Sequence, residues 1–342
     1  MTGAARTSGR MGLWRPRLVR SARAGVPDAT VRAALAGEDW QCERALRTVS
    51  DTAVLMVHTP GGKTGTLKIA ATGNGAASLR REHEVLGQLG SDERLGAWRQ
   101  LLPVPLSWGE TAGGGFLLTS RLPGRDGRHP PPGVRDRLTS AAFDSIAPLH
   151  RHMQTVAVVD AALLRRWVEE PAEQLRKVAR SAAAVDRVTA ALHAGLAARP
   201  VTLGWAHGDF HPGNVLAGPR GQVTGIVDWD QARERDLGTA DLAFWLLTLP
   251  SPGRRREFGA RVAARLGARP CWTPAESRLL GSVADGAPAA GRALLLLAWL
   301  RHVAGNLAKS ERYARSPLWV RRNVNPVLRQ LADGLPRRAH RR

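Results

Sequence analysis

Cysteine and long apolar runs are both scarce in this chain of 342 residues. Only Cys42 and Cys271 occur, with no CxxC pair and no Cys/His cluster at zinc spacing, so we expect neither a disulfide framework nor a structural metal. The longest strictly apolar run, residues 293–300, is far shorter than the roughly 20 residues that span a bilayer. The first 25 residues hold six arginines but no apolar signal-peptide core. These absences predict a cytoplasmic protein without a transmembrane segment.

Aromatic residues and lysine are also rare. The chain has five phenylalanines and one tyrosine, and lysine supplies only four of the 50 basic side chains. The other 46 are arginines spread along the whole chain, and the formal net charge is +21. This charge is the only sign of a nucleic-acid binder, because no nucleic-acid-binding motif or aromatic-interleaved basic strand accompanies it. We therefore expect no specific nucleic-acid partner.

The basic side chains are densest near the C-terminus. Residues 301–342 hold eleven Lys/Arg against two acids, Glu311 and Asp333. Such a segment could meet an anionic partner or a membrane surface, although a solvated surface is the more common role of such charge. No motif in the segment selects one of these partners.

The pattern of apolar residues divides the chain into a small sheet-based part and a larger helical part. Residues 1–28 lack periodicity and are rich in Arg, Ser and Gly, which predicts a basic flexible extension. We expect an N-terminal lobe over residues 29–122, a helical C-terminal lobe over 123–335 and a basic tail over 336–342. The expected class is α+β and bilobal, with a small antiparallel sheet followed by a mostly helical lobe.

Short apolar runs and turn residues predict the individual elements. Residues 53–57 and 66–70 flank the turn formers Pro60, Gly61 and Gly62, which predicts a β-hairpin. The other predicted elements are a helix over 77–89, a strand over 116–122, helical segments over 138–153, 161–168 and 174–198, strands over 214–216 and 223–227, and helices from 239 onward.

The strongest chemical signal is the stretch HGDFHPGN at residues 207–214, followed after a short hairpin by IVDWD at 226–230. An aspartate, an asparagine five residues later and a carboxylate at the end of the next strand suit phosphoryl transfer. Asp209 can accept the proton of an attacking hydroxyl or orient that hydroxyl. Asn214 and Asp228 can hold Mg²⁺ against the phosphates of ATP, because Mg²⁺ prefers oxygen ligands.

This passage resembles the catalytic loop and metal-binding segment of the aminoglycoside phosphotransferase and choline kinase family, whose members are relatives of the protein kinases. The resemblance implies a protein-kinase-like fold and a small-molecule kinase that uses ATP and Mg²⁺. It implies that Asp209 is the catalytic base, that Asn214 and Asp228 are the magnesium ligands, and that His207 anchors the loop. Asp230 stands where the family often has an acid, which would assist the metal or hydrogen-bond the loop.

Two segments of the N-terminal part resemble the nucleotide-binding elements of the same family. GTLKIA at residues 65–70 resembles the strand whose lysine, here Lys68, touches the α- and β-phosphates of ATP. REHEVL at 81–86 resembles the helix whose glutamate, here Glu82, pairs with that lysine. Such a pair fixes the ammonium group over the phosphates.

The resemblance also suggests contacts to the rest of the nucleotide. No GxGxxG occurs between residues 47 and 57, so the Ser50 hydroxyl and the neighbouring backbone N–H groups would contact the phosphates. Residues 116–122 resemble the strand and hinge between the lobes, where backbone groups of Ser120 and Leu122 would meet the adenine edge.

Two residues are expected to support the site from a distance. DLGTADLA at residues 236–243 resembles the segment in which the family buries a structural aspartate, here Asp241. An ordinary helix-cap acid is an equally open interpretation of Asp241, since both roles satisfy backbone N–H groups. His150 resembles a family histidine that packs inside the larger lobe.

Two other functional classes are weaker than an active small-molecule kinase. A non-catalytic nucleotide-binding regulatory module on the same fold would be expected to lack the base or a metal ligand, and none is missing. A protein kinase is disfavoured because a D-F-G triplet and a recognisable activation segment are absent. No motif specifies the acceptor. A chain this basic suits a neutral or anionic hydroxyl compound, such as a sugar, a macrolide-like metabolite or a lipid head group, better than a polycationic aminoglycoside.

Overall fold

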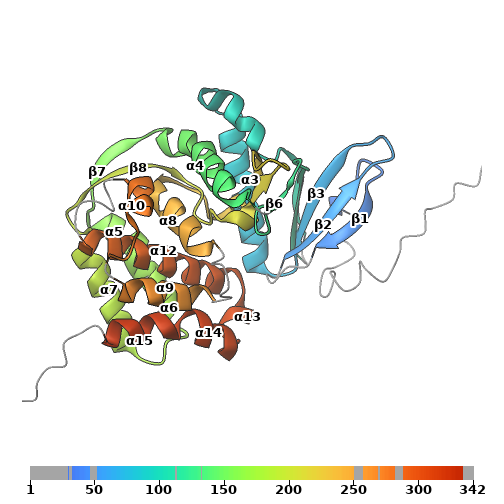
Figure 1. Ribbon diagram of the computed structural model, residues 1–342. Helices are drawn as coiled ribbons and strands as arrows, with labels where there is room; N and C mark the ends of the chain where they lie inside the picture. Colours follow the sequence, from blue (N-terminus) through green and yellow to red (C-terminus); the bar gives the residue numbers. More distant parts are fainter. Residues whose placement is uncertain are drawn as a thin grey trace, which may run out of the picture.

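The computed structural model describes residues 30, 33–46, 52–111, 114–131, 133–249, 257–268, 270–281 and 288–333. The predicted extension over residues 1–28, the tail over 336–342 and Ser50 lie outside these described residues. A small sheet lies beside a larger group of helices, with helix α3 (Gly73–Ser91) between them (Figure 1). The predicted order, a small antiparallel sheet followed by a mostly helical part, is confirmed.

The sheet of the N-terminal part has five antiparallel strands in the order β1-β2-β3-β5-β4. The predicted hairpin is confirmed as β2 (Thr52–His58) and β3 (Thr64–Ala70), and β5 (Gly114–Ser120) pairs with the other side of β3. The edge strands β1 (Gln41–Leu46) and β4 (Pro105–Thr111) were not predicted. Edge strands are hard to find from sequence, because their side chains are often exposed and need not alternate.

The hairpin folds as predicted, and every second side chain of β2 is buried on one face. Ala53, Leu55 and Val57 are buried, while the residues between them are half-buried. Together with side chains from β3 and β5 they form the core of the sheet. Lys68 lies on β3 between the buried residues Leu67 and Ile69, so its side chain points to the opposite face of the strand.

Helix α3 begins after Thr72, whose Oγ1 accepts a hydrogen bond from the Gly75 backbone N–H at 3.2 Å. Its buried face is formed by the predicted apolar stripe and by one carboxylate, Glu82. The helix contacts β5 and the 3-10 turn η4 (Trp229–Gln231) of the helical part. Helix α3 therefore brings Glu82 to the boundary between the two parts of the molecule.

The helical part departs from prediction where one helical segment was expected over residues 174–198. Helix α6 ends at Arg176 and α7 begins at Ala182, because the Ser181 hydroxyl accepts from the Ala184 N–H at 3.3 Å and caps a new helix. The helices of this part are α4 (Arg135–Arg151), α5 (Ala161–Leu164), the π-helical turn η2 (Arg165–Glu169), α6 (Glu170–Arg176), α7 (Ala182–Leu196), α8 (Gly238–Thr248), α9 (Phe258–Gly267), α10 (Pro274–Leu280), α12 (Pro288–Lys309), α13 (Glu311–Ala314), α14 (Pro317–Asn323) and α15 (Asn325–Asp333).

Two small three-stranded sheets lie within this helical part, in the orders β10-β9-β6 and β11-β8-β7. The predicted strands at 214–216 and 223–227 are confirmed as β9 and β10, whereas the strands of the second sheet were not predicted. The strands are β6 (Arg125–Asp126), β7 (Thr155–Val158), β8 (Pro200–Ala206), β9 (Val215–Ala217), β10 (Val223–Ile226) and β11 (Arg233–Asp236). The motif at residues 207–214 connects the two sheets, since it follows β8 and precedes β9.

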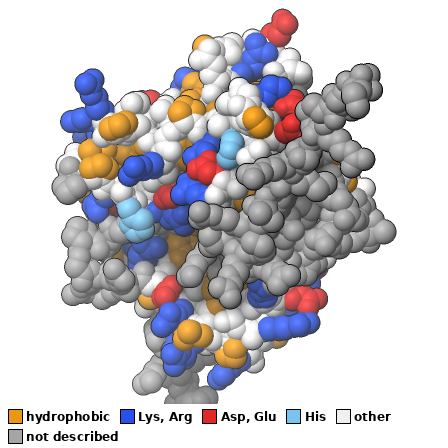
Figure 2. All heavy atoms as spheres, turned by 90° about the vertical axis from the view of Figure 1, so that its right-hand side faces the viewer, with side chains coloured by type: hydrophobic (Ala, Val, Ile, Leu, Met, Phe, Trp, Pro, Cys, Tyr) orange, Lys and Arg blue, Asp and Glu red, His pale blue; other side chains and the backbone are white. Residues whose placement is uncertain are grey.

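The main hydrophobic core lies in the helical part and includes large aromatic side chains. Trp167, Trp229, Trp245 and Trp299 are among its fully buried residues. No helix among the described residues is long and apolar enough to cross a membrane. Basic side chains are spread over the face shown in Figure 2 and interspersed with acidic ones.

Candidate active site

The loop at residues 207–214 is held in place by the buried carboxylate of Asp241. This carboxylate accepts hydrogen bonds from the backbone N–H groups of His207 at 2.7 Å and Gly208 at 2.9 Å, and His150 Nε2 lies 3.0 Å from it. Desolvation alone would raise the pKa of Asp241, but these donors hold the pKa below its usual value. The structure therefore places Asp241 under the loop. Asp241 does not cap its own helix α8, whose N-cap residue, Leu237, makes no side-chain cap hydrogen bond.

The ring of His207 connects this loop to the end of β10. His207 is fully buried, and desolvation lowers the pKa of its imidazole, which favours the neutral ring. Its Nδ1 accepts from the Asp209 backbone N–H at 3.3 Å, so Nε2 carries the proton and donates to the Val227 carbonyl oxygen at 3.0 Å. Gly208 has φ +79°, and a Cβ there would lie 2.3 Å from the Gln231 carbonyl oxygen, so only glycine fits.

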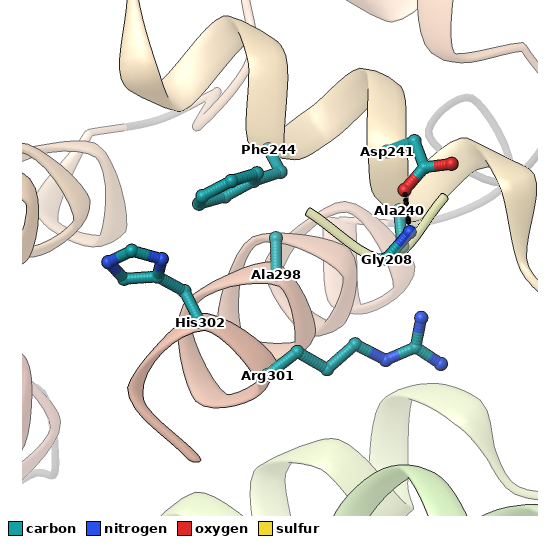
Figure 3. A pocket seen from close by; sticks show the side chains of 7 residues that line it. All are labelled: Gly208, Ala240, Asp241, Phe244, Ala298, Arg301 and His302. Atoms are coloured by element: carbon teal, nitrogen blue, oxygen red, sulfur yellow. Dashed lines mark hydrogen bonds between the residues drawn. The ribbon is translucent and has the colours of Figure 1, made fainter. Parts of the chain in front are cut away.

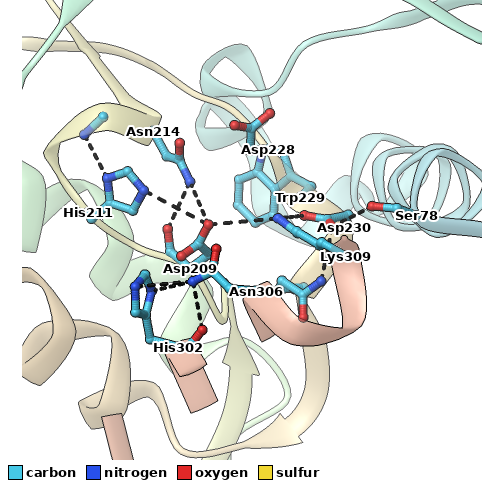
Figure 4. A network of polar contacts seen from close by, with 12 residues as sticks. Ser78, Asp209, His211, Asn214, Asp228, Trp229, Asp230, His302, Asn306 and Lys309 are labelled. Carbon is cyan, nitrogen blue, oxygen red and sulfur yellow. Dashed lines mark hydrogen bonds and ion pairs between the residues drawn. The ribbon is translucent and has the colours of Figure 1, made fainter. Parts of the chain in front are cut away.

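Asp209 and Asn214 lie side by side on this loop (Figure 4). The Asn214 Nδ2 donates to the Asp209 carbonyl oxygen at 3.0 Å and to Asp209 Oδ2 at 3.3 Å. The side-chain oxygen of Asn214 is therefore the atom that remains for another ligand. His211 Nε2 lies 3.9 Å from Asp209 Oδ2, and the His211 Nδ1 accepts from the Gly213 N–H at 2.9 Å.

Asp228 lies two residues after the end of β10 in a left-handed backbone conformation, with φ 65° and ψ 62°. A non-glycine residue rarely adopts this conformation unless its surroundings impose it, and such positions cluster at functional sites. The neighbouring Val227 N–H donates to the Asn214 carbonyl oxygen at 2.9 Å. This bond ties the segment to the loop at residues 207–214, which is called the catalytic-loop motif below because of the family resemblance. The conformation leaves the Asp228 side chain 43% exposed beside that loop.

Lys68 joins the sheet to this site through two carboxylates. Its Nζ lies 2.7 and 2.8 Å from the two oxygens of Glu82, and it also contacts Asp228 Oδ1. Desolvation alone would lower the pKa of Lys68, but Asp228 and Glu82 raise it, so the ammonium stays charged. Desolvation alone would raise the pKa of Asp228, but Lys68 and Lys309 hold this pKa below its usual value. The structure thus brings these two sequence-predicted residues into contact with Asp228.

The oxygen atoms of Asp228 and Asn214 are the groups that could hold Mg²⁺ here. The described residues contain no cluster of three or more His, Cys, Asp or Glu side chains suited to a metal. Mg²⁺ is usually bound by one or two carboxylates together with substrate phosphates and water. Asp228 and Asn214 fit that pattern. Lys68 contacts Oδ1 of Asp228, which leaves Oδ2, and Asn214 donates its amide N–H to Asp209, which leaves its side-chain oxygen.

Asp230 lies in a different environment from Asp228. It is 5% exposed and accepts from the Ser78 hydroxyl at 2.5 Å and from Gln231 Nε2 at 3.0 Å. Lys309, at the C-terminal end of α12, places its Nζ 3.0 Å from Asp230 Oδ1. Asp230 is predicted to assist the metal or to hydrogen-bond the loop; in the structure its hydrogen bonds and ion pair connect α3 to α12.

Lys309 and Ser78 are site residues that sequence reasoning missed. The Lys309 Nζ also lies 3.9 Å from Asp209 Oδ2, so it stands between Asp209 and Asp230 (Figure 4). Only the scarcity of lysine could have drawn attention to it, because no motif surrounds residue 309. Ser78 gave no signal, since a serine on a helix surface is common.

A match to a known protein family covers the segments of this site up to residue 280 and so leaves out Lys309. Residues 43–280 match the model of the phosphotransferase enzyme family, which covers more than half of the chain. The chain belongs to this family. No curated protein sequence gives a significant match.

Solved structures of this phosphotransferase fold agree with the family assignment. A thermostable variant of aminoglycoside phosphotransferase APH(4)-Ia, in a ternary complex with ADP and hygromycin B, is 14% identical with a TM-score of 0.56. The match covers 86% of this chain and 96% of that chain. APH(3'')-Id from Streptomyces rimosus, in complex with ADP and streptomycin, is 18% identical with a TM-score of 0.50, covering 79% of this chain and 96% of that one. These similarities show the bilobal protein-kinase-like fold.

A small cavity of this phosphotransferase lies behind the catalytic-loop motif (Figure 3). Its volume is about 10 Å³, room for about one water molecule. Its lining residues come from the loop, α8 and α12, namely Gly208, Ala240, Asp241, Phe244, Ala298, Arg301 and His302. The cavity is too small for an acceptor and belongs to the packing that supports the loop.

Ser120 and Leu122, which are predicted to meet the adenine edge, lie at the end of β5 and just after it. The Ser120 backbone N–H donates to the Val104 carbonyl oxygen at 2.8 Å, and the Ser120 hydroxyl accepts from the Val104 N–H at 2.8 Å. That N–H is therefore occupied within the sheet, because β4 extends the sheet beside β5. Leu122 follows β5, with its side chain against Gly225 of β10.

Proposed function

We propose that this chain is an ATP- and Mg²⁺-dependent phosphotransferase that moves the γ-phosphoryl group of ATP to a hydroxyl of a small molecule. The observation that supports this best is the convergence of Lys68, Asp209, Asn214 and Asp228, which come from separate strands and loops, on one site. In this proposal residues 29–122 bind the nucleotide, and residues 123–335 supply the catalytic loop and the acceptor site.

Each side chain has a task that follows from its chemistry. Asp209 accepts the hydrogen bond of the acceptor hydroxyl, orients it for in-line attack and takes its proton. Lys68, fixed by Glu82 at 2.7 Å, holds the α- and β-phosphates. Asn214 and Asp228 hold Mg²⁺, which supplies neutralisation of the phosphate charge. His207 and Asp241 keep the loop in the conformation that presents Asp209.

The nucleotide is proposed to be ATP because the fold is that of the two ADP complexes described above. The adenine edge would lie near Leu122 in the segment between the two lobes. Ser120 would contribute its carbonyl oxygen at most, since its N–H donates to Val104. Ser50 is proposed to lie over the phosphates.

The acceptor is proposed to be a neutral or anionic hydroxyl compound and not a polycation. The relatives named above bind hygromycin B and streptomycin. In this chain two basic side chains, His211 and Lys309, stand 3.9 Å from Asp209 Oδ2, and the formal net charge is +21. A cationic group close to the reacting hydroxyl would be repelled by Lys309. Efficient turnover of kanamycin-type compounds would contradict this acceptor class.

The test of the proposed function is ADP release from Mg-ATP in the presence of a panel of aminoglycosides, macrolides, sugars, amino alcohols and nucleosides. One compound class should stimulate ADP release. Asp209→Asn should lower that rate by about 10²–10⁴-fold, because the hydroxyl loses its general base. The matched control is Asp136→Asn, which makes the same change at an exposed aspartate of α4.

A stimulated rate that survives Asp209→Asn would refute the role given to Asp209. Mg-ATP binding without stimulation by any compound class would favour a non-catalytic nucleotide-binding module on the same fold.

A further inference from the structure

We propose that Lys309 binds the phosphoryl group in transfer, as a second lysine of the active site that is supplied by the C-terminal helix α12. The inference rests on the proposed ATP-dependent phosphoryl transfer and assigns a task to a residue outside every motif of the sequence. Three observations carry it: the position of the ammonium group, its free hydrogen-bonding capacity and the choice of lysine at this position.

The ammonium group lies where the reacting atoms must meet. The Lys309 Nζ is 3.0 Å from Asp230 Oδ1 and 3.9 Å from Asp209 Oδ2. An acceptor hydroxyl bound to Asp209 lies about 2.7 Å from a carboxylate oxygen. The phosphorus under attack adjoins that hydroxyl, so its equatorial oxygens come within reach of the Lys309 side chain.

The hydrogen-bonding capacity of Lys309 is not exhausted by its neighbours. An ammonium group has three N–H donors, and Asp230 accepts one of them at 3.0 Å. The distance of 3.9 Å to Asp209 is too long for a hydrogen bond. The side chain is 24% exposed, so the remaining donors can meet an anionic oxygen that enters the site.

The surrounding carboxylates keep the Lys309 ammonium group charged, and one of them, Asp230, orients it. Desolvation alone would lower the pKa of Lys309, but Asp230, Asp209 and Asp228 raise it, so the ammonium stays protonated at neutral pH. Other titratable side chains among the described residues also face this region, namely His211, His302, Lys68 and Glu82. Ser78 and Gln231 bond the far oxygen of Asp230 and thereby fix the carboxylate that orients Lys309.

The use of lysine at this position is informative in a chain that otherwise uses arginine. Only four of 50 basic residues are lysines, and two of them, Lys68 and Lys309, lie in this site. Lysine presents a compact point charge with rotatable donors, whereas arginine presents a wide planar fork. A cation supplied from another segment to a transferring phosphoryl group stabilises the charge that develops there.

The competing explanation is a purely structural tether. Lys309 and Asp230 connect α12 to Ser78 of α3, and such a link could serve only to hold the two parts of the molecule together. A tether would affect the binding of every nucleotide to the same extent. A phosphoryl contact affects only ligands that carry a group in the γ position.

The experiment compares the affinity of the full chain for Mg-ADP alone and for Mg-ADP with aluminium fluoride, which mimics the transferring phosphoryl group. Affinities are measured by titration calorimetry, so no acceptor or turnover is needed. In the unsubstituted protein, aluminium fluoride should tighten the binding of Mg-ADP. Lys309→Met should reduce this gain by roughly ten- to hundred-fold, as expected for a lost charged hydrogen bond, while the affinity for Mg-ADP alone changes little.

Two further variants separate the explanations. Lys177→Met makes the same change at an exposed lysine of the helical part and should leave the gain unchanged. Lys309→Arg keeps a cation and should restore part of the gain. An equal loss of affinity for both ligands in Lys309→Met, or an unchanged gain, would overturn the assignment of Lys309.

The outcome also separates this inference from the proposed function. An unsubstituted protein that binds no Mg-ADP would remove both proposals. Binding of Mg-ADP with a gain from aluminium fluoride that Lys309→Met retains would leave the proposed function standing and remove the role of Lys309 alone.

Discussion

His302 shows how tightly single side chains are constrained behind the catalytic-loop motif. Its ring lies 5.0 Å from the Phe244 ring and 4.6 Å from the Phe258 ring, measured between centroids. Asn306 donates to its backbone carbonyl oxygen at 2.8 Å. Desolvation in this aromatic surrounding lowers the pKa of His302 to about 4. The folded protein therefore keeps this imidazole neutral at a pH where an exposed histidine is charged.

The depressed pKa of His302 predicts a loss of stability in mild acid. Between the unfolded pKa of 6.5 and the folded pKa of about 4, the unfolded chain binds the extra proton. The free energy of unfolding should therefore fall as the pH drops through 6.5, by about 2 kcal/mol between pH 7 and pH 5 from this residue. Denaturant unfolding at both pH values measures this.

The variant His302→Gln isolates this contribution, because glutamine carries no charge at either pH. The difference in free energy of unfolding between the unsubstituted protein and this variant should shrink by about 2 kcal/mol from pH 7 to pH 5. The exposed His129 serves as the control, since His129→Gln should show no such change. The prediction would be contradicted if the free energy of unfolding had the same pH dependence in His302→Gln as in the unsubstituted protein.

At the scale of elements, helix α8 is the support on which the catalytic-loop motif rests. Asp241 in its first turns replaces the hydrogen-bond partners that the loop backbone would otherwise find in water. Helix α4 contributes His150 to the same carboxylate. The pKa of Asp241 is held low by these donors, so the carboxylate stays ionised although it is 2% exposed.

Removal of this carboxylate should loosen the loop and lower the stability of the protein. Asp241→Ala leaves the N–H groups of His207 and Gly208 buried without partners, which should cost about 2–5 kcal/mol in free energy of unfolding. Thermal and denaturant unfolding measure the loss. The same substitution at the exposed Asp136 should have little effect, and a comparable loss there would show that the effect is not specific to the loop.

Prediction of elements from sequence succeeded where apolar side chains repeat locally and failed where they do not. The strands β2 and β3 were found because each contains a short apolar run and turn formers separate the two runs. The edge strand β1 has no buried side chain, so its pairing with β2 could not be read from its own pattern. The break between α6 and α7 was missed because residues 174–198 keep a helical pattern across Ser181.

At the scale of the whole molecule, the site is assembled from both parts of the chain. Lys68 and Glu82 come from the sheet and α3, whereas Asp228, Asp230 and Lys309 come from the helical part. A nucleotide bound here contacts both parts and should stabilise them together. On the face shown in Figure 2, basic side chains of the described residues are interspersed with acidic ones.

Nucleotide binding should therefore be visible as thermal stabilisation. Saturating Mg-ADP, at about 100 times its dissociation constant, should stabilise the folded protein by about 2.7 kcal/mol, measured as an upward shift of the unfolding temperature. Lys68→Met should reduce the shift because the phosphates lose their lysine. Lys63→Met, at an exposed lysine between β2 and β3, is the matched control and should retain the shift. An undiminished shift in Lys68→Met would contradict the role given to Lys68.

The amino-acid sequence was enough to predict the family, the order of sheet and helices, and the residues of the candidate site that lie in short motifs. Asp209, Asn214 and Asp228 could be named because their spacing along the chain is set by one loop and one strand. Lys68 and Glu82 could be paired only through the resemblance, and the structure then put them 2.7 Å apart.

Which distant residues meet at the site became visible in the folded molecule alone. Lys309 and Ser78 reach Asp230 from α12 and α3, and Asp241 binds the loop backbone instead of capping its own helix. These contacts depend on how whole helices pack against one another, and packing is fixed by side chains spread over the entire core. The spacing of residues in a motif carries information only about neighbours along the chain. The position of Lys309 beside Asp209 could therefore not be predicted from the sequence around residue 309.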